Sequence, residues 1–261
     1  METPEQAAQR IFGERSQFYA GSVVHKDPEV LKRVVELAAP NDDLLALDVA
    51  TGSGHTAAAL APHVAGIVCV DITHQMIAQA EKLTLELSLP NLRFCMGDAQ
   101  ALPFRDKVFD IVTCRRAAHH FSDITLALQE MKRVMRSSGR LVLDDRSVPE
   151  DDFADSCMNE LGRLHDGSHV REYRPSQWRR LLESSGFAVD SVEPYSKHLP
   201  LTSLMGNAPP ENVGKIHAIV SSLTEEERKT MNVAEVEGQI HLNHWYVMIS
   251  ARLSATDRSF V

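Results

Sequence analysis

Residues 44–60 read Leu-Leu-Ala-Leu-Asp-Val-Ala-Thr-Gly-Ser-Gly-His-Thr-Ala-Ala-Ala-Leu and combine three local patterns. The apolar run 44–49, set between turn-forming residues, predicts a strand that is buried on both faces. Gly52 and Gly54 predict a tight turn whose backbone a ligand can approach closely. The small and apolar residues 55–60 predict a helix. A strand, a glycine turn and a helix in this order are typical of nucleotide-binding α/β sheets.

Further strands and helices alternate along the chain after this unit. We expect seven strands, at 44–49, 66–71, 92–96, 109–114, 140–144, 187–192 and 245–253. Amphipathic helices separate most of them, and one of these helices begins at Ser122 and ends at Gly139. The alternation predicts an α/β fold with a mostly parallel, doubly wound sheet that carries helices on both faces.

We interpret residues 1–261 as a single domain with four parts. These are a helical N-terminal cap at 1–43, a ligand-binding core at 44–192, an insertion at 193–238 and the last strand at 239–255. The insertion interrupts the alternation with prolines and glycines, and it contains one polar helix near 224–231. A long insertion in a compact domain is commonly functional, so we expect a lid over the ligand.

The composition excludes several classes of protein. The chain is 43% hydrophobic and 24% charged with a net charge of -9, so we expect a globular protein with no nucleic-acid partner. No stretch approaches the roughly 18 apolar residues of a membrane span, and the N-terminus lacks the pattern of a signal peptide. Four cysteines without CxxC spacing predict reduced thiols and a cytoplasmic location.

Acidic residues follow three neighbouring strands. Asp48 and Asp71 end the first two strands, and Asp98 lies just after the third. The carboxyl ends of parallel strands meet at one edge of a sheet, so we expect these side chains to converge on one ligand. An acid about twenty residues beyond the glycine turn is placed to hold ribose hydroxyls. Ala57 occupies the third glycine position, which dinucleotide-binding loops accept, so this loop alone leaves NAD open.

Five motifs in this order resemble those of class I S-adenosylmethionine-dependent methyltransferases. They are DVATGSG (48–54), CVDIT (69–73), GDAQALPF (97–104), VFDIVTCRRAAHHFSD (108–123) and GRLVLDD (139–145). The resemblance covers about residues 15–195 and is closest to the type 11 branch, related to the ubiquinone and menaquinone C-methyltransferases. It implies a Rossmann-like sheet of seven strands with an antiparallel last strand. It also implies S-adenosylmethionine as cofactor, S-adenosylhomocysteine as product and a small-molecule methyl acceptor.

The resemblance also implies roles for nine residues around the cofactor. Those beside its methionine part are Asp48, Ala50, Gly52, Gly54 and, through its backbone, Arg115. Those beside its adenosine part are Asp71 on the ribose hydroxyls, Ile72 packed on the adenine, and Asp98 and Ala99 at the adenine edge. Ala50 departs from the family pattern, which usually has glycine at this position.

Methyl transfer is an in-line displacement that depends on proximity, orientation and exclusion of water, and it requires no metal. A base is needed only where the acceptor must lose a proton. The tentative catalytic residues are His119 and His120, which follow the fourth strand, and Tyr19 in the cap. The alternative readings are that the histidines fix their loop and that Tyr19 packs in its helix. The sequence leaves open whether carbon, oxygen, nitrogen or sulfur is methylated.

Two other groups of basic residues are candidates for chemistry. One follows the fifth strand and either attracts an acidic acceptor or forms a solvated helix face; it consists of His165, His169, Arg171 and Arg174. The other is His241 and His244 at the entry to the last strand, where a spacing of three points side chains to opposite faces. The chain has no HExxH motif and no Cys/His cluster, so we expect no metal site.

Two further functions stay open on the sequence. An NAD-dependent oxidoreductase would use the glycine loop and Asp71 but would leave residues 98–104 unexplained. An antiparallel last strand at the sheet edge favours methyl transfer, whereas a purely parallel sheet with a second catalytic domain favours hydride transfer. A cofactor-binding protein without turnover is the third hypothesis, because Ala50 departs from the family pattern and no base is evident. The assembly to test is a homodimer.

Overall fold

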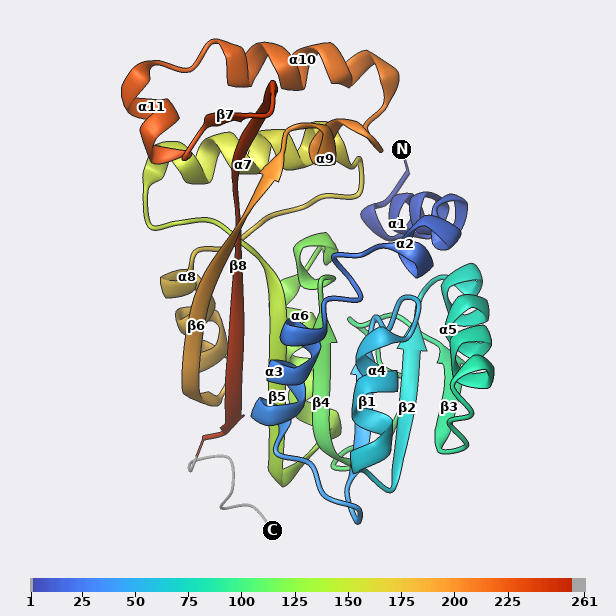
Figure 1. Cartoon of the computed structure of the whole chain (residues 1–261). Helices are drawn as coiled ribbons and strands as arrows, with labels where there is room; N and C mark the ends of the chain where they lie inside the picture. Colours follow the sequence, from blue (N-terminus) through green and yellow to red (C-terminus); the bar gives the residue numbers. More distant parts are fainter. Residues whose placement is uncertain (1, 255–261) are drawn as a thin grey trace.

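The computed structural model describes residues 2–254, which form one mixed sheet flanked by helices (Figure 1). The strands follow the order β3-β2-β1-β4-β5-β8-β6, and the short β7 pairs with β8. Their bounds are β1 Leu45–Val49, β2 Gly66–Asp71, β3 Leu92–Met96, β4 Phe109–Arg115, β5 Met135–Ser147, β6 Phe187–Pro200, β7 Ala234–Val236 and β8 Gln239–Leu253. Strands β1 to β5 pair in parallel, whereas β8 runs antiparallel to β5 and β6. The predicted doubly wound, mostly parallel sheet with an antiparallel last strand is confirmed.

Helices cover both faces of the sheet because successive side chains of a strand point to opposite faces. On one face, Leu47 of β1 belongs to a core with residues of α6 (Ile124–Val134) and α8 (Pro175–Ser184). On the other, Ala46 packs in a second core with α3 (Pro28–Ala38) and α4 (His55–Leu60). The apolar run that begins at residue 44 therefore has both of its faces buried, as its sequence predicts.

Strand β5 begins earlier than expected. Helix α6 ends at Val134 and β5 starts at Met135, so Gly139 lies inside the strand, and the prediction that Gly139 ends the helix is wrong. A Cβ atom on Gly139 would lie 2.9 Å from the carbonyl oxygen of Arg136. The glycine therefore serves a close approach of backbone within β5 and not a helix C-cap.

Strand β6 continues well beyond its expected end at residue 192. Residues 193–200 pair with β8, and they include Pro194 and Pro200. A proline is tolerated there because β6 is an edge strand, where a missing N–H interrupts no second ladder. The last strand, β8, lies between β5 and β6 and not at the sheet edge, and it runs antiparallel to both neighbours, the feature that favours methyl transfer. Residue 255, which we expected to end it, lies outside the described residues.

The N-terminal helices lie above the carboxyl ends of the parallel strands, next to α5 (His74–Glu86) (Figure 1). They are α1 (Pro4–Glu14) and α2 (Ser16–Gly21). A capping box formed by Thr3 and Gln6 starts α1, with a proline in its first turn. The Gln9 side chain donates a hydrogen bond of 3.0 Å to the carbonyl oxygen of Ile72, which ties α1 to the loop after β2.

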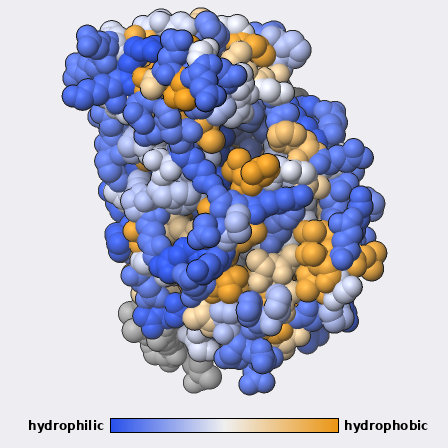
Figure 2. Space-filling view, viewed as in Figure 1, coloured by the Kyte–Doolittle hydropathy of each residue, from blue (hydrophilic) through white to orange (hydrophobic). Residues whose placement is uncertain are grey.

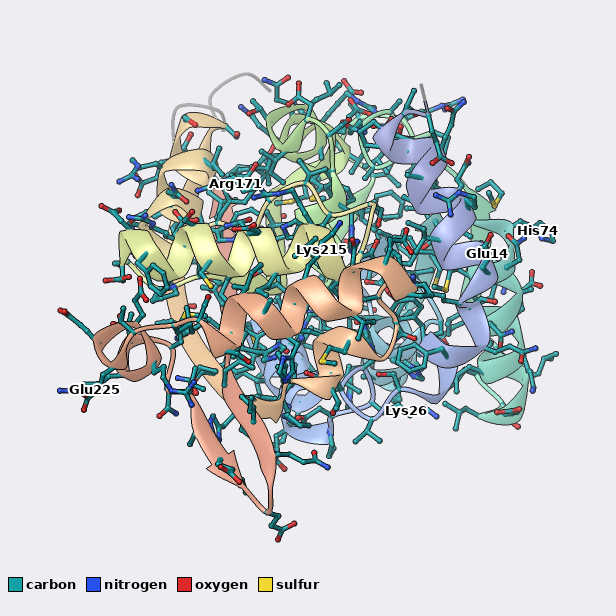
Figure 3. All side chains as sticks on the ribbon, turned by 90° about the horizontal axis from the view of Figure 1, so that it is seen from above. Glu14, Lys26, His74, Arg171, Lys215 and Glu225 are labelled. Atoms are coloured by element: carbon teal, nitrogen blue, oxygen red, sulfur yellow. The ribbon has the colours of Figure 1, made fainter. Side chains whose placement is uncertain are left out.

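A second helical layer lies above the same edge of the sheet, on the side away from α5 (Figure 1). It consists of α7 (Asp152–His165), α9 (Thr202–Met205), α10 (Pro210–Ser221) and α11 (Glu225–Thr230). Seen from above, α7 and α10 run side by side (Figure 3), and Met158, Ile216 and Val220 pack in a third core between them. Helix α11 matches the predicted polar helix, whereas α10 was not predicted.

On the face shown in Figure 2, apolar residues form separate groups between hydrophilic ones. None of the helices within residues 2–254 is both long enough and apolar enough to cross a membrane.

Candidate active site

The glycine turn after β1 uses left-handed backbone at three positions. Gly52 has φ of 54° and Gly54 has φ of 84°, which glycine adopts without strain. A Cβ atom on Gly54 would lie 2.9 Å from Cβ of Ala80 on α5, so this glycine lets the start of α4 approach α5 closely. A Cβ atom on Gly52 would meet nothing within 4 Å, because this residue borders a cavity.

Ala50 also adopts left-handed backbone, with φ of 52°. A non-glycine residue in this region is strained by roughly 1–2 kcal/mol. Glycine would adopt this backbone without that strain. The alanine methyl group keeps the turn and lines the same cavity as Gly52.

Asp48 lies at the end of β1 and is fully buried. Its two carboxylate oxygens accept hydrogen bonds of 2.6 Å each, from the hydroxyls of Thr113 and Thr51. Burial raises the pKa of Asp48, and these hydroxyl donors oppose the shift. Both threonines fix the carboxylate beside the turn, one from β4 and one from the turn itself.

Asp71 ends β2 and faces the same turn. Its carboxylate accepts hydrogen bonds from the backbone N–H of Gly52 (2.8 Å) and of Thr73 (2.9 Å). Burial raises the pKa of Asp71, whereas the two N–H donors lower it. Each carboxylate oxygen keeps a further lone pair, so the side chain can still accept from two hydroxyl groups of a ligand.

Asp98 follows β3 and belongs to a polar network that reaches the cap. Its Oδ1 accepts a 2.9 Å hydrogen bond from the Gln100 backbone. The Gln100 side chain donates to Glu5 of α1 at 3.1 Å, and Ser122 donates to both Glu5 and Gln100. The sequence analysis did not single out Glu5 or Gln100. The acidic first turn of α1 was the only signal, and it gave no indication of its distant partner.

A cavity lies under the N-terminal helices, at the carboxyl ends of β1, β2 and β4. Eight of the nine residues expected around the cofactor line it: Asp48, Ala50, Gly52, Asp71, Ile72, Asp98, Ala99 and Arg115. Gly54 does not, because it packs against α5. Met76, Phe12 and Phe121 supply apolar lining that the sequence analysis did not single out. We call this the first cavity.

Arg115 lies at the end of β4 with its guanidinium buried. Nε donates to the Thr56 hydroxyl at 2.8 Å, and Nη2 donates to the carbonyl oxygen of His25 at 2.7 Å. Nη1 lies 3.9 Å from Asp144 and is buried without a hydrogen-bond partner. The first cavity thus contains one buried cationic donor that the described protein atoms do not satisfy.

A second cavity adjoins the first, between the cap, the strand ends and the upper helical layer. Five residues line both cavities: Phe12, Tyr19, His25, Arg116 and His120. The second cavity is further lined by His119, His165, His169, His244 and Arg146, with apolar contributions from Phe18, Leu199 and Leu204. The geometry therefore offers two joined compartments with one shared boundary.

His119 faces only the second cavity and is oriented by Asp145. Its Nδ1 lies 2.6 Å from Oδ1 of Asp145, and its backbone N–H donates to Oδ2 at 2.8 Å. Burial lowers the pKa of His119 well below its usual range and raises the pKa of Asp145 to about 7. A neutral imidazole that donates from Nδ1 keeps Nε2 as an acceptor, an arrangement that suits a general base.

His120 and Tyr19 lie at the boundary between the two cavities. His120 Nδ1 is 3.0 Å from the hydroxyl of Ser168, which donates to Asp166 at 2.7 Å. Burial raises the pKa of Tyr19 to about 12, so its hydroxyl stays protonated at neutral pH. The structure thus places all three tentative catalytic residues around the second cavity, two of them at its junction with the first.

The basic residues after the fifth strand separate into two pairs. His165 and His169 line the second cavity, where burial lowers their pKa to about 4 and about 2. Arg171 and Arg174 instead bind the carboxylate of Asp155 at 3.0 and 2.8 Å. The four side chains therefore do not form one patch. In the described part of the chain, no group of three or more His, Cys, Asp or Glu side chains is placed to hold a metal ion.

Comparison with known proteins identifies the family. Residues 47–143 match the family model described as a methyltransferase domain. The chain is 34% identical over 221 residues to an uncharacterized methyltransferase of Bacillus subtilis, YcgJ, covering 84% of this chain and 87% of that protein. It is 35% identical over 173 residues to the ubiquinone/menaquinone biosynthesis C-methyltransferase UbiE of Rickettsia akari, covering 57% of this chain and 70% of that protein.

Solved structures agree with this result. The crystal structure of YcgJ matches with a TM-score of 0.80 at 32% identity, covering 86% of this chain and 97% of that chain. A putative methyltransferase from Bacillus halodurans matches with a TM-score of 0.82 at 30% identity, covering 86% and 99%. The chain belongs to the S-adenosylmethionine-dependent methyltransferases, with S-adenosylmethionine as its cofactor. Hydride transfer with NAD is not favoured.

Proposed function

We propose that the protein transfers a methyl group from S-adenosylmethionine, held in the first cavity, to a small-molecule acceptor held in the second. The observation that carries this proposal is the shared boundary of the two cavities, with Tyr19, Arg116 and His120 at the junction. In-line displacement requires donor and acceptor to meet with water excluded. Two joined compartments under a helical cap satisfy this requirement.

In this proposal the acids of the first cavity hold the cofactor by its adenosine. Asp71 accepts from the ribose hydroxyls, and Asp98 with Ala99 binds the adenine edge. Ile72 packs on the adenine ring. The cofactor supplies an electrophilic methyl group on a sulfonium. The free lone pairs of Asp71 support the ribose assignment, because they can accept two hydroxyl donors.

The methionine end lies at the glycine turn in the same proposal. Asp48, Ala50 and Gly52 border it, and Gly54 acts indirectly by closing the turn against α5. The unsatisfied Nη1 of Arg115 is available to the methionine carboxylate, in addition to the backbone contact to the ammonium group that we expect at this residue. A buried guanidinium donor without a partner is costly, so a ligand carboxylate there would relieve that cost.

His119 acts as the base where the acceptor must lose a proton. Nε2 of His119 removes the proton, and Asp145 stabilises the resulting positive charge from the Nδ1 side. The acceptor atom forms a bond to the methyl carbon, and the carbon–sulfur electron pair leaves with sulfur. His120 and Tyr19 position the acceptor at the junction.

The remaining expectations concern organisation and location. We propose that residues 193–238 act as a lid in a single-domain enzyme, together with the cap at 1–43. The lining of the second cavity supports this, because it includes Leu199, Ser203, Leu204 and Asn207 of the insertion. The net charge of -9 supports the absence of a nucleic-acid partner, and the free cysteines support a cytoplasmic location. A homodimer remains a prediction for analytical ultracentrifugation.

Calorimetry followed by a turnover assay tests the proposed function. We expect S-adenosylhomocysteine to bind with a stoichiometry of one and NAD not to bind. With methyl-labelled S-adenosylmethionine, an acceptor panel of phenols, quinols and other small metabolites should yield labelled product. Binding of NAD in place of S-adenosylhomocysteine would contradict the proposal. Cofactor binding without labelled product from any acceptor would favour a binding protein without turnover.

A further inference from the structure

The second cavity contains an arginine whose hydrogen-bonding capacity is not used. Arg146 lies near the end of β5, and its Nε is 2.6 Å from Oε1 of Glu172. Its Nη2 is buried without a hydrogen-bond partner. A guanidinium offers five N–H donors in a planar fork, so this one can donate hydrogen bonds to a ligand that carries two oxygens.

Arg116, which lies just beyond β4, brings a second guanidinium to the same cavity. Its Nε donates to Asp144 at 3.0 Å and its Nη2 to the Tyr195 hydroxyl at 3.0 Å. The guanidinium carbon lies 3.8 Å from the centre of the Tyr246 ring, which fixes the plane of the fork. Among the described hydrogen bonds none uses Nη1 of Arg116. Its φ of 57° is left-handed, so the chain holds this side chain in place at the cost of backbone strain.

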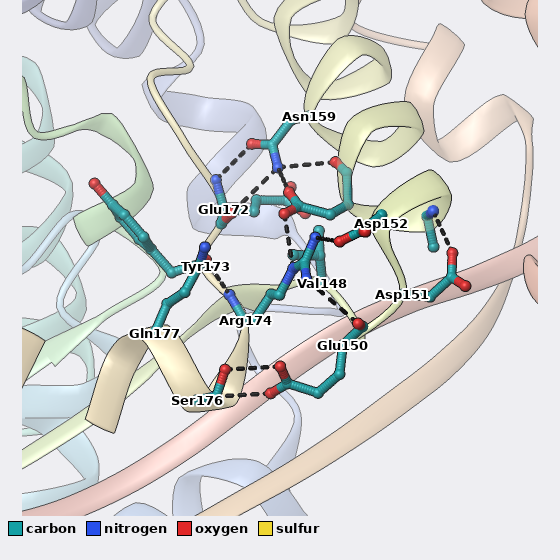
Figure 4. Close-up of polar contacts among 12 residues, drawn as sticks. Val148, Glu150, Asp151, Asp152, Asn159, Glu172, Tyr173, Arg174, Ser176 and Gln177 are labelled. Atoms are coloured by element: carbon teal, nitrogen blue, oxygen red, sulfur yellow. Dashed lines mark hydrogen bonds and ion pairs between the residues drawn. The ribbon is translucent and has the colours of Figure 1, made fainter. Parts of the chain in front are cut away.

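The carboxylate that faces Arg146 belongs to Glu172, which does not line the cavity, and both of its oxygens are buried without a hydrogen-bond partner. Asn159 of α7 bonds both backbone groups of Glu172, accepting from its N–H at 2.8 Å and donating to its carbonyl oxygen at 3.2 Å (Figure 4). Burial raises the pKa of Glu172 to about 7. Glu172 therefore compensates the Arg146 charge only in part near neutral pH.

The other polar groups that line the second cavity determine the sign and the size of the charge that a ligand can carry there. Asp166 is the carboxylate among the lining residues, and Ser168 and Arg15 face it at 2.7 and 3.8 Å. His120 and Ser168 lower the pKa of Asp166 to about 2 against the effect of its burial, so it is ionised. His165, His169 and His244 are neutral because burial lowers their pKa. Of the charged side chains that line the second cavity, the two guanidiniums of Arg116 and Arg146 face a single carboxylate, Asp166, so one added negative charge balances them.

We propose, on the basis of the proposed function, that the methyl acceptor is a monoanionic carboxylic acid with an apolar or aromatic body. Its carboxylate binds the open donors of Arg146 and Arg116. Its body packs against Phe12, Phe18 and Leu204, and its nucleophilic atom faces the junction with the first cavity. Arginine suits this role because its fork matches the two oxygens of a carboxylate.

Calorimetry on the protein saturated with S-adenosylhomocysteine tests this inference, with matched acids and amides as probes. The pairs are 4-hydroxybenzoate with 4-hydroxybenzamide and octanoate with octanamide, and phenyl phosphate tests a dianion. We expect at least one acid to bind tenfold or more tightly than its amide and than phenyl phosphate at pH 7.5. Equal binding of acids and amides, preference for the phosphate, or no binding of any acid would overturn the inference.

Variants of Arg146 test whether this side chain causes the preference for acids over amides. Arg146→Gln should remove the preference for acids. If this single variant is unstable, the double variant Arg146→Gln with Glu172→Gln should restore folding and likewise lack the preference. Arg171→Gln, which loses its contacts with Asp155 and the Tyr173 ring outside the second cavity, is the matched control and should keep the preference. An acid preference that survives in both Arg146 variants would overturn the assignment. Failure to bind S-adenosylhomocysteine in the first titration would instead contradict the proposed function.

Discussion

The imidazole of His119 and the carboxylate of Asp145 lie 2.6 Å apart, Nδ1 to Oδ1; His119 belongs to the short helical turn Ala118–His120 after β4, and Asp145 lies near the end of β5. Asp145 also accepts from the His119 backbone, so one carboxylate fixes both the ring and the loop that carries it. This contact leaves Nε2 directed away from Asp145 and places His119 among the lining residues of the second cavity. The pair therefore has the geometry of an oriented base.

Asp145→Asn and His119→Gln should each lower kcat by about 10²–10⁴-fold for an acceptor that must lose a proton, because proton transfer by a positioned group contributes a factor of this size. Cofactor affinity should stay within about threefold, since neither residue lines the first cavity. Steady-state kinetics and calorimetry with S-adenosylhomocysteine measure both quantities. His63→Gln, an exposed histidine, is the control. A kcat that is unchanged in both variants would show that His119 is not the base.

The pH profile of the enzyme should report the same pair. Burial lowers the pKa of His119 and raises that of Asp145 to about 7. As the pH rises through about 7, the pair therefore loses the proton that would compete with the proton of the acceptor for His119. The activity should therefore be low below this pH and reach a plateau above it. Measurement of kcat/KM from pH 5 to 9 gives the profile. In Asp145→Asn the step near pH 7 should vanish, and its persistence would assign it to another group.

Ala50→Gly should stabilise the protein by about 0.5–1 kcal/mol, because glycine relieves the left-handed strain and loses part of this gain to chain entropy. Urea unfolding measures the free energy difference. Ala58→Gly in α4 is the control and should destabilise by about the same amount, since it adds glycine to a helix without relieving strain. A loss of stability in Ala50→Gly would mean that the turn is not strained at this position.

Glu5→Ala should speed the dissociation of S-adenosylhomocysteine by roughly three- to tenfold, which corresponds to the loss of a hydrogen-bond network of modest net strength. Glu5 links α1 to Gln100 and Ser122 at the side of the first cavity where we propose that the adenine binds, and the Ser122 hydroxyl lowers the pKa of Glu5 to about 2. Stopped-flow fluorescence measures the rate. Glu2→Ala, which loses only an exposed contact with Arg10, should leave the rate unchanged. Equal rates in both variants would remove Glu5 from the cap closure.

The sequence predicted the sheet best where strands are buried on both faces. Leu47 and Val49 lie in such a strand, and the apolar run around them is its signature. The missed elements contain prolines, which were read as breaks. Pro194 and Pro200 are tolerated because β6 is an edge strand, and Pro210 is tolerated because it occupies the first turn of α10. Both contexts depend on tertiary position, which a local pattern does not contain.

The residues of the candidate site also divide into those that the sequence pattern predicts and those that depend on tertiary position. Asp48, Asp71 and Asp98 could be predicted because each ends or follows a strand of one parallel sheet, and their convergence is a consequence of topology. Asp145 stood within a quoted motif, but its pairing with His119 depends on how β4 and β5 lie side by side. Glu5 reaches Gln100 beside the first cavity only because α1 folds back over the sheet, and a contact between residues 95 positions apart leaves no pattern in the local sequence.

Titration of S-adenosylhomocysteine into the wild-type protein and the Asp71→Ala variant tests the central claim most directly. We predict binding of one molecule to the wild type and at least tenfold weaker binding to the variant, because the variant loses the acceptor for both ribose hydroxyls. Asp42→Ala, on the exposed turn before β1, should bind as the wild type does. Equal dissociation constants for wild type and Asp71→Ala would contradict the placement of the cofactor in the first cavity.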